Sequence, residues 1–347
     1  MIQFQCDYNE GCHPAILQRL VETNMQQTVG YGYDRYCQEA CALIRKACNA
    51  PDTDVHFLVG GTQANTTVIS SILRPHQGVI AAESGHINVH ETGAIEHTGH
   101  KVITLPTSNG KICASDMARY LRAFYAQDEP EHMVQPGMVY ISFPTELGTL
   151  YSKHEIADIQ SVCKQYALPL FIDGARLGYG LCSPECDLTL CDLATLCDVF
   201  YIGGTEVGAL FGEAVVIMNK SLTKDFRYFI KQQGGMLAKG RLLGIQFSQL
   251  FTDDLYLKIS RHAIDMAMLI KASLIEKGYS FFVDSPTNQQ FPILPNELLK
   301  KISQDFLLSS WESVDDNHTA VRICTSWGTK PEAVQALIDA LPNLKMM

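Results

Sequence analysis

The chain has 347 residues, of which 27 are basic and 37 are acidic, so its formal net charge at pH 7 is −10. A chain of this length usually forms one large domain and a smaller one. The negative charge argues against a nucleic-acid or anionic-membrane partner. The chain has no apolar run of about 18 residues and no basic N-terminal segment followed by an apolar core, so we expect a cytoplasmic protein with a small-molecule partner.

Twelve cysteines are scattered along the chain, often inside apolar runs, and we expect them to be reduced thiols. The densest group is Cys182, Cys186, Cys191 and Cys197. The gaps between these cysteines widen along the chain, whereas zinc sites favour paired short spacings. We therefore favour apolar packing over metal binding for this group, and we expect no metal site.

The N-terminal segment 1–14 is predicted to be a polar arm, and Pro14 then begins a helix with apolar positions on one face. A loop without function is the alternative interpretation of the arm. Tyr33 and Asp34 follow in a glycine-rich turn before a helix over 35–48. For this turn, the simplest prediction is that Asp34 caps the helix.

A strand over 55–59 runs into Gly60-Gly61-Thr62, where a helix begins. Small residues at such a junction let backbone N–H groups approach a ligand, and the helix N-terminus favours a phosphate. The sequence matches neither the dinucleotide nor the P-loop motif. Because glycine turns are common in α/β proteins, this signal alone is ambiguous.

Four histidines lie between 86 and 100, and they raise the hypothesis of a metal site. The spacing of His86 and His90 suits a metal only on a helix, and Gly85 and Gly93 interrupt this stretch. A structural role is the default interpretation for a loop histidine. Residues Thr145 and Glu146 follow another predicted strand and are candidates for the lining of a pocket.

Two continuous apolar runs carry the strongest signal. The first, 167–176, ends in Asp173 and Arg176, and the second, 197–208, ends in Thr205 and Glu206. Continuous apolar runs are typical of parallel strands covered on both faces. Ligands in such sheets bind beyond the carboxyl ends of the strands, so these four side chains are predicted to converge on one pocket.

Strands and helices alternate between 55 and 217, which predicts an α/β fold with a mostly parallel sheet covered by helices. We divide the chain into the arm 1–14, a large cofactor-binding domain 15–252, and a linking helix with a small α/β C-terminal domain 253–347. Arg322 lies on a predicted strand of this last unit. Its planar guanidinium suits a carboxylate, although an arginine on a half-exposed strand is otherwise unremarkable.

The Asp-Gly-Ala-Arg run at 173–176, followed by a strand and Gly-Gly-Thr-Xaa-Xaa-Gly at 203–208, resembles the threonine aldolase and β-eliminating lyase group of pyridoxal-phosphate enzymes. The resemblance covers nearly the whole chain and implies a fold type I large domain like that of aspartate aminotransferase. It also implies bound pyridoxal 5′-phosphate and retro-aldol cleavage of β-hydroxy amino acids such as L-threonine or L-allo-threonine to glycine and an aldehyde. A homodimer or homotetramer with the active site at the subunit interface is expected by the same resemblance.

The resemblance also implies roles for single residues. It places the cofactor phosphate near Gly61, Thr62 and Thr205, the ring near His86, Asp173 and Arg176, and the neighbouring subunit's phosphate near Lys231. It assigns Asn9, Tyr33 and Arg322 to the substrate. His86 is expected to stack on the ring and to take part in proton transfer, and Asp173 to face the ring nitrogen.

The sequence departs from the family pattern at Glu206, where the family has the lysine that bonds covalently to the cofactor aldehyde. A carboxylate cannot form an imine, and Lys220 and Lys224 lie beyond the next strand. Without this amine we expect non-covalent cofactor binding and impaired turnover. Glu206 is also expected near the phosphate, and like charges 4 Å apart repel by about 4 kcal/mol at an effective dielectric near 20, so we expect weaker cofactor binding or a protonated Glu206. A non-catalytic relative and an unrelated α/β oxidoreductase with Glu206 as acid or base are the alternatives, and the missing dinucleotide motif disfavours the second.

Overall fold

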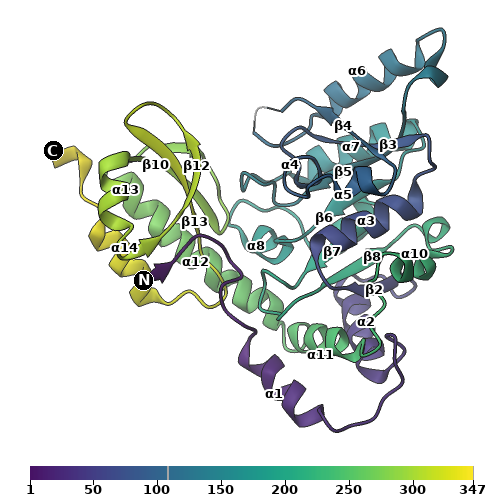
Figure 1. Cartoon of the computed structure of the whole chain (residues 1–347), viewed down its shortest axis with the longest axis horizontal. Helices are drawn as coiled ribbons and strands as arrows, with labels where there is room; N and C mark the ends of the chain where they lie inside the picture. Colours follow the sequence, from purple (N-terminus) through teal and green to yellow (C-terminus); the bar gives the residue numbers. More distant parts are fainter. Residues whose placement is uncertain (108, 347) are drawn as a thin grey trace.

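A seven-stranded sheet forms the centre of the computed structural model, which describes residues 1–107 and 109–346 (Figure 1). Its strands, in spatial order, are β2 (Asp54–Leu58), β8 (Glu213–Ile217), β7 (Val199–Gly203), β6 (Leu170–Asp173), β5 (Gln135–Ser142), β3 (Gln77–Ala82) and β4 (Lys101–Leu105). β8 runs antiparallel to both of its neighbours, and the other pairs are parallel. The predicted mostly parallel sheet is confirmed.

The sheet is buried on both faces, which is why its strands are continuous apolar runs. Every residue of β6, β7 and β8 is buried. One face packs against α2 (Arg35–Ala47), α6 (Ala114–Tyr125), α7 (Lys153–Gln165), α9 (Leu190–Leu196) and α11 (Arg241–Leu250). The other face packs against α3 (Gly61–Ile72), α4 (His86–Val89), α5 (Ala94–His97) and α10 (Phe226–Gln232).

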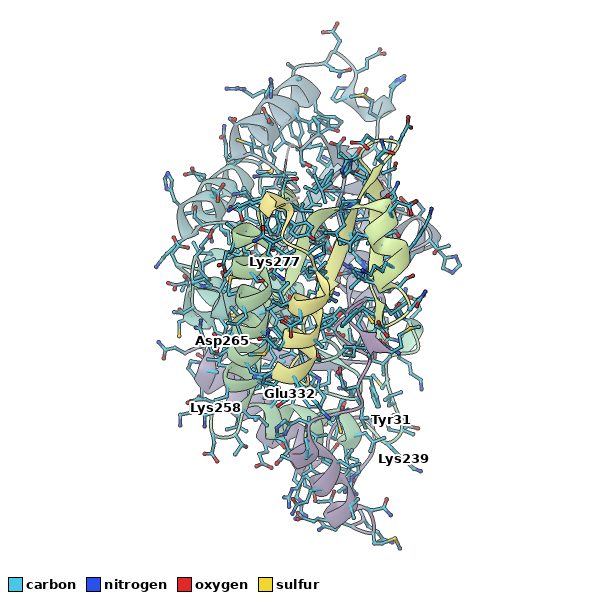
Figure 2. The ribbon with its side chains drawn as sticks, turned by 90° about the vertical axis from the view of Figure 1, so that its left-hand side faces the viewer. Tyr31, Lys239, Lys258, Asp265, Lys277 and Glu332 are labelled. Atoms are coloured by element: carbon cyan, nitrogen blue, oxygen red, sulfur yellow. The ribbon has the colours of Figure 1, made fainter. Side chains whose placement is uncertain are left out.

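The C-terminal part has its own sheet and its own apolar core. The strands β12 (Ser309–Ser313), β13 (His318–Cys324), β10 (Gln289–Pro295) and β9 (Phe281–Val283) pair antiparallel in this order, and α13 (Asn296–Ile302) follows β10. The long helix α12 (Leu255–Glu276) and α14 (Pro331–Ala340) lie side by side (Figure 2). Lys277, directly after α12, joins the C-terminal ends of the two helices, since its Nζ donates to the carbonyl of Leu341 at the end of α14 at 2.6 Å. The exact domain limits stay a prediction.

Short elements connect these parts: α1 (Pro14–Thr23), α8 (Leu177–Cys182) and the 3-10 turns Pro130–His132, Lys220–Leu222 and Leu344–Met346. Asp34 caps α2, because its carboxylate accepts from the backbone N–H groups of Tyr36 and Cys37 at 3.0 Å. In the part of the chain that the structure describes, no helix is both long enough and apolar enough to cross a membrane.

The N-terminal arm connects the C-terminal part with the turn that follows β6 of the large sheet. Strand β1 (Ile2–Gln3) pairs in parallel with β11 (Phe306–Leu307). Further along the arm, the fully buried Asp7 accepts two hydrogen bonds from the guanidinium of Arg176, at 2.7 and 2.9 Å. Asn288 donates to the same carboxylate at 2.8 Å. Asp7 therefore joins the arm, the turn after β6 and the segment before β10.

We expect Asp7→Ala to lower the free energy of unfolding by about 3–5 kcal/mol, because it leaves the buried Arg176 charge without its carboxylate. Urea denaturation followed by circular dichroism measures the change. Glu22→Ala is the control, since it breaks the exposed Arg19–Glu22 pair and is expected to cost about 1 kcal/mol or less. Equal, small losses in the two variants would show that the Asp7–Arg176 pair does not stabilise the fold.

Candidate active site

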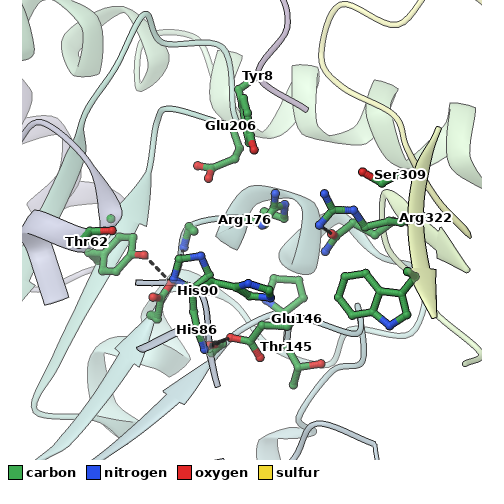
Figure 3. Close-up of a pocket in the computed structure, with 18 of the residues that line it drawn as sticks. Tyr8, Thr62, His86, His90, Thr145, Glu146, Arg176, Glu206, Ser309 and Arg322 are labelled. Carbon is green, nitrogen blue, oxygen red and sulfur yellow. Dashed lines mark hydrogen bonds between the residues drawn. The ribbon is translucent and has the colours of Figure 1, made fainter. Parts of the chain in front are cut away.

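A pocket of about 670 Å³ opens at the carboxyl ends of β5 and β6, where the C-terminal sheet faces the large one (Figure 3). Its position follows from the direction of the parallel strands. Two glycines bring the turns after β6 and β7 together: a side chain on Gly174 would meet the carbonyl oxygen of Tyr201 at 2.0 Å, and one on Gly203 would meet that of Ala175 at 1.8 Å. The Asp173 and Glu206 turns can therefore lie side by side.

Asp173 is held at the pocket by four hydrogen-bond donors. Tyr140 Oη and Asn65 Nδ2 donate to one carboxylate oxygen at 2.6 and 3.1 Å. Tyr201 Oη and the backbone N–H of Ala175 donate to the other oxygen. The side chain is buried and lines the pocket. Its oxygens are thereby fixed as acceptors for a cationic or N–H group of a ligand.

The N-terminus of α3 reaches the same pocket. Gly60 occupies the N-cap position and offers no side-chain cap, so the first backbone N–H groups of this helix lack that partner. Gly61 and Thr62 line the pocket. A side chain at Gly61 would lie 3.1 Å from the hydroxyl of Tyr201, so glycine keeps this end of the helix open. An anion such as a phosphate fits here.

His86 lines the pocket, and its imidazole is hydrogen-bonded to a carboxylate, as is typical of a histidine that transfers protons. Its Nδ1 lies 2.7 Å from Oε1 of the buried Glu91, and Asn65 donates to the same oxygen at 2.7 Å. Because Asn65 also contacts Asp173, one chain of hydrogen bonds joins Asp173 to His86. Burial lowers the pKa of His86, but the bond to Glu91 and the charges of nearby acids outweigh it, so the pKa of this imidazole is raised overall.

Two arginines also line the pocket, and they have different partners. Arg176 is bound by Asp7. Arg322 lies 5.7 Å from the ring centre of Trp311, and its Nη atoms donate to Gln289 Oε1 and to the carbonyl of Gln5. The buried Nε of Arg322 and Nε2 of Gln289 have no hydrogen-bond partner among the described residues. These two donors suit a carboxylate.

Glu206 faces the pocket across from His86 and Glu146 (Figure 3). Its buried Oε2 accepts no hydrogen bond from the described residues. Burial raises the pKa of Glu206 to about 7, although the charge of Arg176 opposes the shift. Burial and the charge of Glu206 also raise the pKa of Glu213 on β8, so the two carboxyl groups disfavour each other's ionisation.

The structure brings together most, but not all, of the residues that the sequence nominated. His86, Asp173, Arg176, Glu206, Arg322, Gly61 and Thr62 all line the pocket, as do Thr145 and Glu146. Asn9, Tyr33, Thr205 and Lys231 do not line it in this single chain. The Thr205 hydroxyl instead donates to Glu213 at 2.8 Å, and the Lys231 ammonium lies 5.4 Å from the ring centre of Tyr31.

Several pocket residues had no sequence signal strong enough to find them. Tyr8 lines the pocket in place of the predicted Asn9, and Ser309, Ser310 and Trp311 enter it from β12. Gln289 begins β10 and meets Arg322 across the antiparallel sheet. The alternating pattern of the C-terminal strands could have suggested inward positions, but only the packing of the two sheets tells which of them face the pocket.

Residues 3–281 match the family model described as beta-eliminating lyase, and the chain belongs to this family. Over 348 aligned residues it is 29% identical to a low specificity L-threonine aldolase from Pseudomonas sp. (strain NCIMB 10558), with 96% of this chain and 95% of the relative covered. The resemblance stated from the sequence motifs is confirmed at the level of the family.

Among solved structures, the threonine aldolase of Leishmania major is similar with a TM-score of 0.95 and 45% identity, and 98% of each chain is covered. The histidinol-phosphate aminotransferase from Clostridium acetobutylicum has a TM-score of 0.75 at 13% identity, with 100% of this chain and 99% of that chain covered. This second likeness supports the fold alone. The fold is that of the fold type I pyridoxal-phosphate enzymes.

The pocket fits a phosphorylated pyridine cofactor in three places. The fixed carboxylate of Asp173 suits the ring nitrogen, the uncapped start of α3 suits the phosphate, and the side chain of His86 suits a ring face. It lacks the group for a covalent bond to the cofactor, because none of the described residues that line it is a lysine. The donor set therefore matches a cofactor held without a covalent bond.

We expect the pH dependence of stability to reveal the buried Glu206. A folded-state pKa near 7, above the usual 4.5, means that the folded protein binds the proton more tightly, so stability falls as pH rises through this interval. Urea denaturation between pH 5 and 8 should show that the wild type loses about 2–3 kcal/mol more than Glu206→Gln over this range. Parallel pH profiles for the two proteins would contradict the raised pKa.

Proposed function

We propose that this chain is a threonine-aldolase-like, pyridoxal-phosphate-dependent lyase that cleaves β-hydroxy amino acids to glycine and an aldehyde. The observation that carries the proposal is the convergence of Asp173, His86 and Arg322 with the start of α3 on one pocket. The names of the relatives from Pseudomonas and Leishmania support the substrate class. We infer that Glu206 occupies the position of the family's lysine, and that turnover by this chain is slow for this reason.

Each side chain of the pocket has a task in this reaction. Arg322 and Gln289 bind the substrate carboxylate with the N–H groups that have no partner among the described residues. Glu91 holds Nδ1 of His86, so Nε2 is the nitrogen that can accept the proton of the substrate hydroxyl, directly or through water. Asp173 would hold the cofactor's ring nitrogen with its fixed carboxylate. When bound, the cofactor supplies the electron sink that makes cleavage of the Cα–Cβ bond feasible.

Glu206→Lys is expected to restore the amine that the pocket lacks. With added pyridoxal 5′-phosphate, only the lysine variant should gain the absorbance band of a covalently bound cofactor. It should also release glycine from L-threonine or L-allo-threonine at least about 100-fold faster than the wild type, which is the usual scale for a positioned acid–base group. Spectrophotometric titration and a coupled aldehyde assay measure the two effects.

Lys220→Ala in the Glu206→Lys background is the control, because Lys220 lies after β8 and is not among the pocket residues. This change should leave the new absorbance band intact. If neither the wild type nor the Glu206→Lys variant takes up the cofactor, the chain shares the fold alone and the aldolase assignment is wrong.

We further propose that two copies of the chain associate through the surface formed by α1 and the segment up to residue 33. This surface exposes several large apolar side chains, including Val21 at 70% and Met25 at 89%. The α10 helix adjoins it, since the Arg227 guanidinium lies 4.3 Å from the ring centre of Tyr33. Tyr31 and Lys239 lie together at the same end of the molecule (Figure 2). Tyr33 and Lys231 would then face a neighbouring subunit.

Sedimentation velocity tests this surface. The wild type should sediment as a dimer or larger, and a Val21→Glu/Met25→Glu double variant should associate at least tenfold more weakly, at about 1.4 kcal/mol per factor of ten. Val314→Glu, at an exposed apolar position in the turn between β12 and β13, is the matched control and should leave association unchanged. A monomeric wild type would contradict the proposed interface.

A further inference from the structure

Three buried polar atoms of the pocket residues have no hydrogen-bond partner in the part of the chain that the structure describes: Glu206 Oε2, Gln289 Nε2 and Arg322 Nε. The two donors lie together, because Arg322 Nη1 also donates to Gln289 Oε1 at 3.3 Å. These two donors suit an anionic ligand group. The acceptor on Glu206 suits a donor, because a buried carboxylate destabilises the protein unless a donor is hydrogen-bonded to it.

The other charged side chains of the pocket make hydrogen bonds to groups of the protein itself. Arg176, whose charge acts on Glu206, uses its Nε and Nη2 on Asp7. Asp173 has four donors, and Glu146 Oε1 accepts from the backbone N–H of His86 at 2.8 Å and from Ser142 at 2.6 Å. Among the described residues that line the pocket, Glu206 is therefore the one that offers a cationic ligand group a buried carboxylate oxygen without a hydrogen-bond partner.

The identity of the missing donor follows from the chemistry of the cofactor. In the ring, the carbon that carries the aldehyde lies opposite the nitrogen. A ring held at Asp173 therefore points this substituent away from Asp173, toward another wall of the pocket. An aldehyde offers only an acceptor oxygen, which cannot satisfy a carboxylate. The aminomethyl form of the same cofactor carries an ammonium group there, with three N–H donors.

We propose that Glu206 binds the primary ammonium group of pyridoxamine 5′-phosphate, and that the pocket therefore holds this form of the cofactor more tightly than the aldehyde form. The inference rests on the proposed function for the cofactor site, and it adds which form of the cofactor the unmodified chain selects. The charge around Glu206 is consistent with it: Asp7, Asp173 and Glu213 favour a cation near this carboxyl, and Arg176, held by Asp7, is the opposing charge.

Isothermal titration calorimetry of the full chain tests the preference with three probes: pyridoxamine 5′-phosphate, pyridoxal 5′-phosphate and 4-deoxypyridoxine 5′-phosphate. The last carries a methyl group in place of the aminomethyl or aldehyde group and cannot react with surface lysines. The wild type should bind the amine form about 10- to 100-fold more tightly than the other two, as expected for a charge-assisted hydrogen bond. Glu206→Gln should reduce this preference to about threefold or less.

Two further variants test whether the preference depends on the carboxyl group at position 206. Glu146→Gln removes a neighbouring pocket carboxyl whose Oε1 is already hydrogen-bonded, and it should keep the preference for the amine form. Glu206→Asp retains a carboxyl group and should keep the direction of the preference. Circular dichroism confirms that each variant is folded.

Equal affinity of the wild type for the three probes, or a preference that survives Glu206→Gln, would overturn the inference while leaving the cofactor site in place. If none of the probes binds, the proposed function fails and the inference fails with it. The last titration uses L-threonine without cofactor. If it binds through Glu206 and no preference among the cofactor forms exists, the ammonium site belongs to the amino acid and the inference is wrong.

Discussion

The buried pair between Asp7 and Arg176 is the interaction on which the geometry of the pocket depends. Asp7 comes from the N-terminal arm, Arg176 from the turn after β6, and Asn288, which donates to the same carboxylate, from the segment before β10. Three distant parts of the chain thus meet at one fixed point. Since the guanidinium has a rigid, planar set of donors, the pair sets orientation as well as distance. The pair also gives Arg176, the cation whose charge acts on Glu206, a hydrogen-bond partner inside the protein.

The pocket residues fall into two groups: some are hydrogen-bonded within the protein, and others have buried polar atoms that a ligand can bind. On the large sheet, Asp173 has four donors and His86 is bound to Glu91, so these groups keep their positions without a ligand. Among the described residues that line the pocket, Glu206 in the turn after β7 keeps one acceptor without a partner, and Gln289 and Arg322 on the C-terminal sheet keep one donor each. Buried polar atoms without partners are uncommon, because each loses its bonds to water on folding. The two donors and the one acceptor therefore indicate a ligand with an anionic group near Arg322 and a cationic group near Glu206.

The proposed replacement of the family's lysine by Glu206 concerns the chemistry of one position, and the other residues of the pocket suit the same cofactor. Burial raises the pKa of Glu206 and of Glu213, and the charge of Glu206 raises the pKa of Glu213 further, so a carboxylate at position 206 is electrostatically unfavourable for its neighbour. The fold tolerates the pair because Thr205 and the backbone N–H of Gly204 donate to Glu213. The same contacts explain why the hydroxyl of Thr205 is engaged within the protein.

The sequence by itself determined the class of fold, the family and the centre of the pocket. Continuous apolar strands followed by Asp173, Glu206 and the Gly60-Gly61-Thr62 turn are local patterns, and parallel strands bring their carboxyl ends to one edge without further information. Only the tertiary structure decided which side chains complete the site. Asp7 finds Arg176 across 169 positions and Asn288 across 281, and the orphaned atoms of Gln289 and Arg322 exist only because two sheets pack around one cavity. Such pairings depend on the mutual placement of distant segments, which no local pattern of residues encodes.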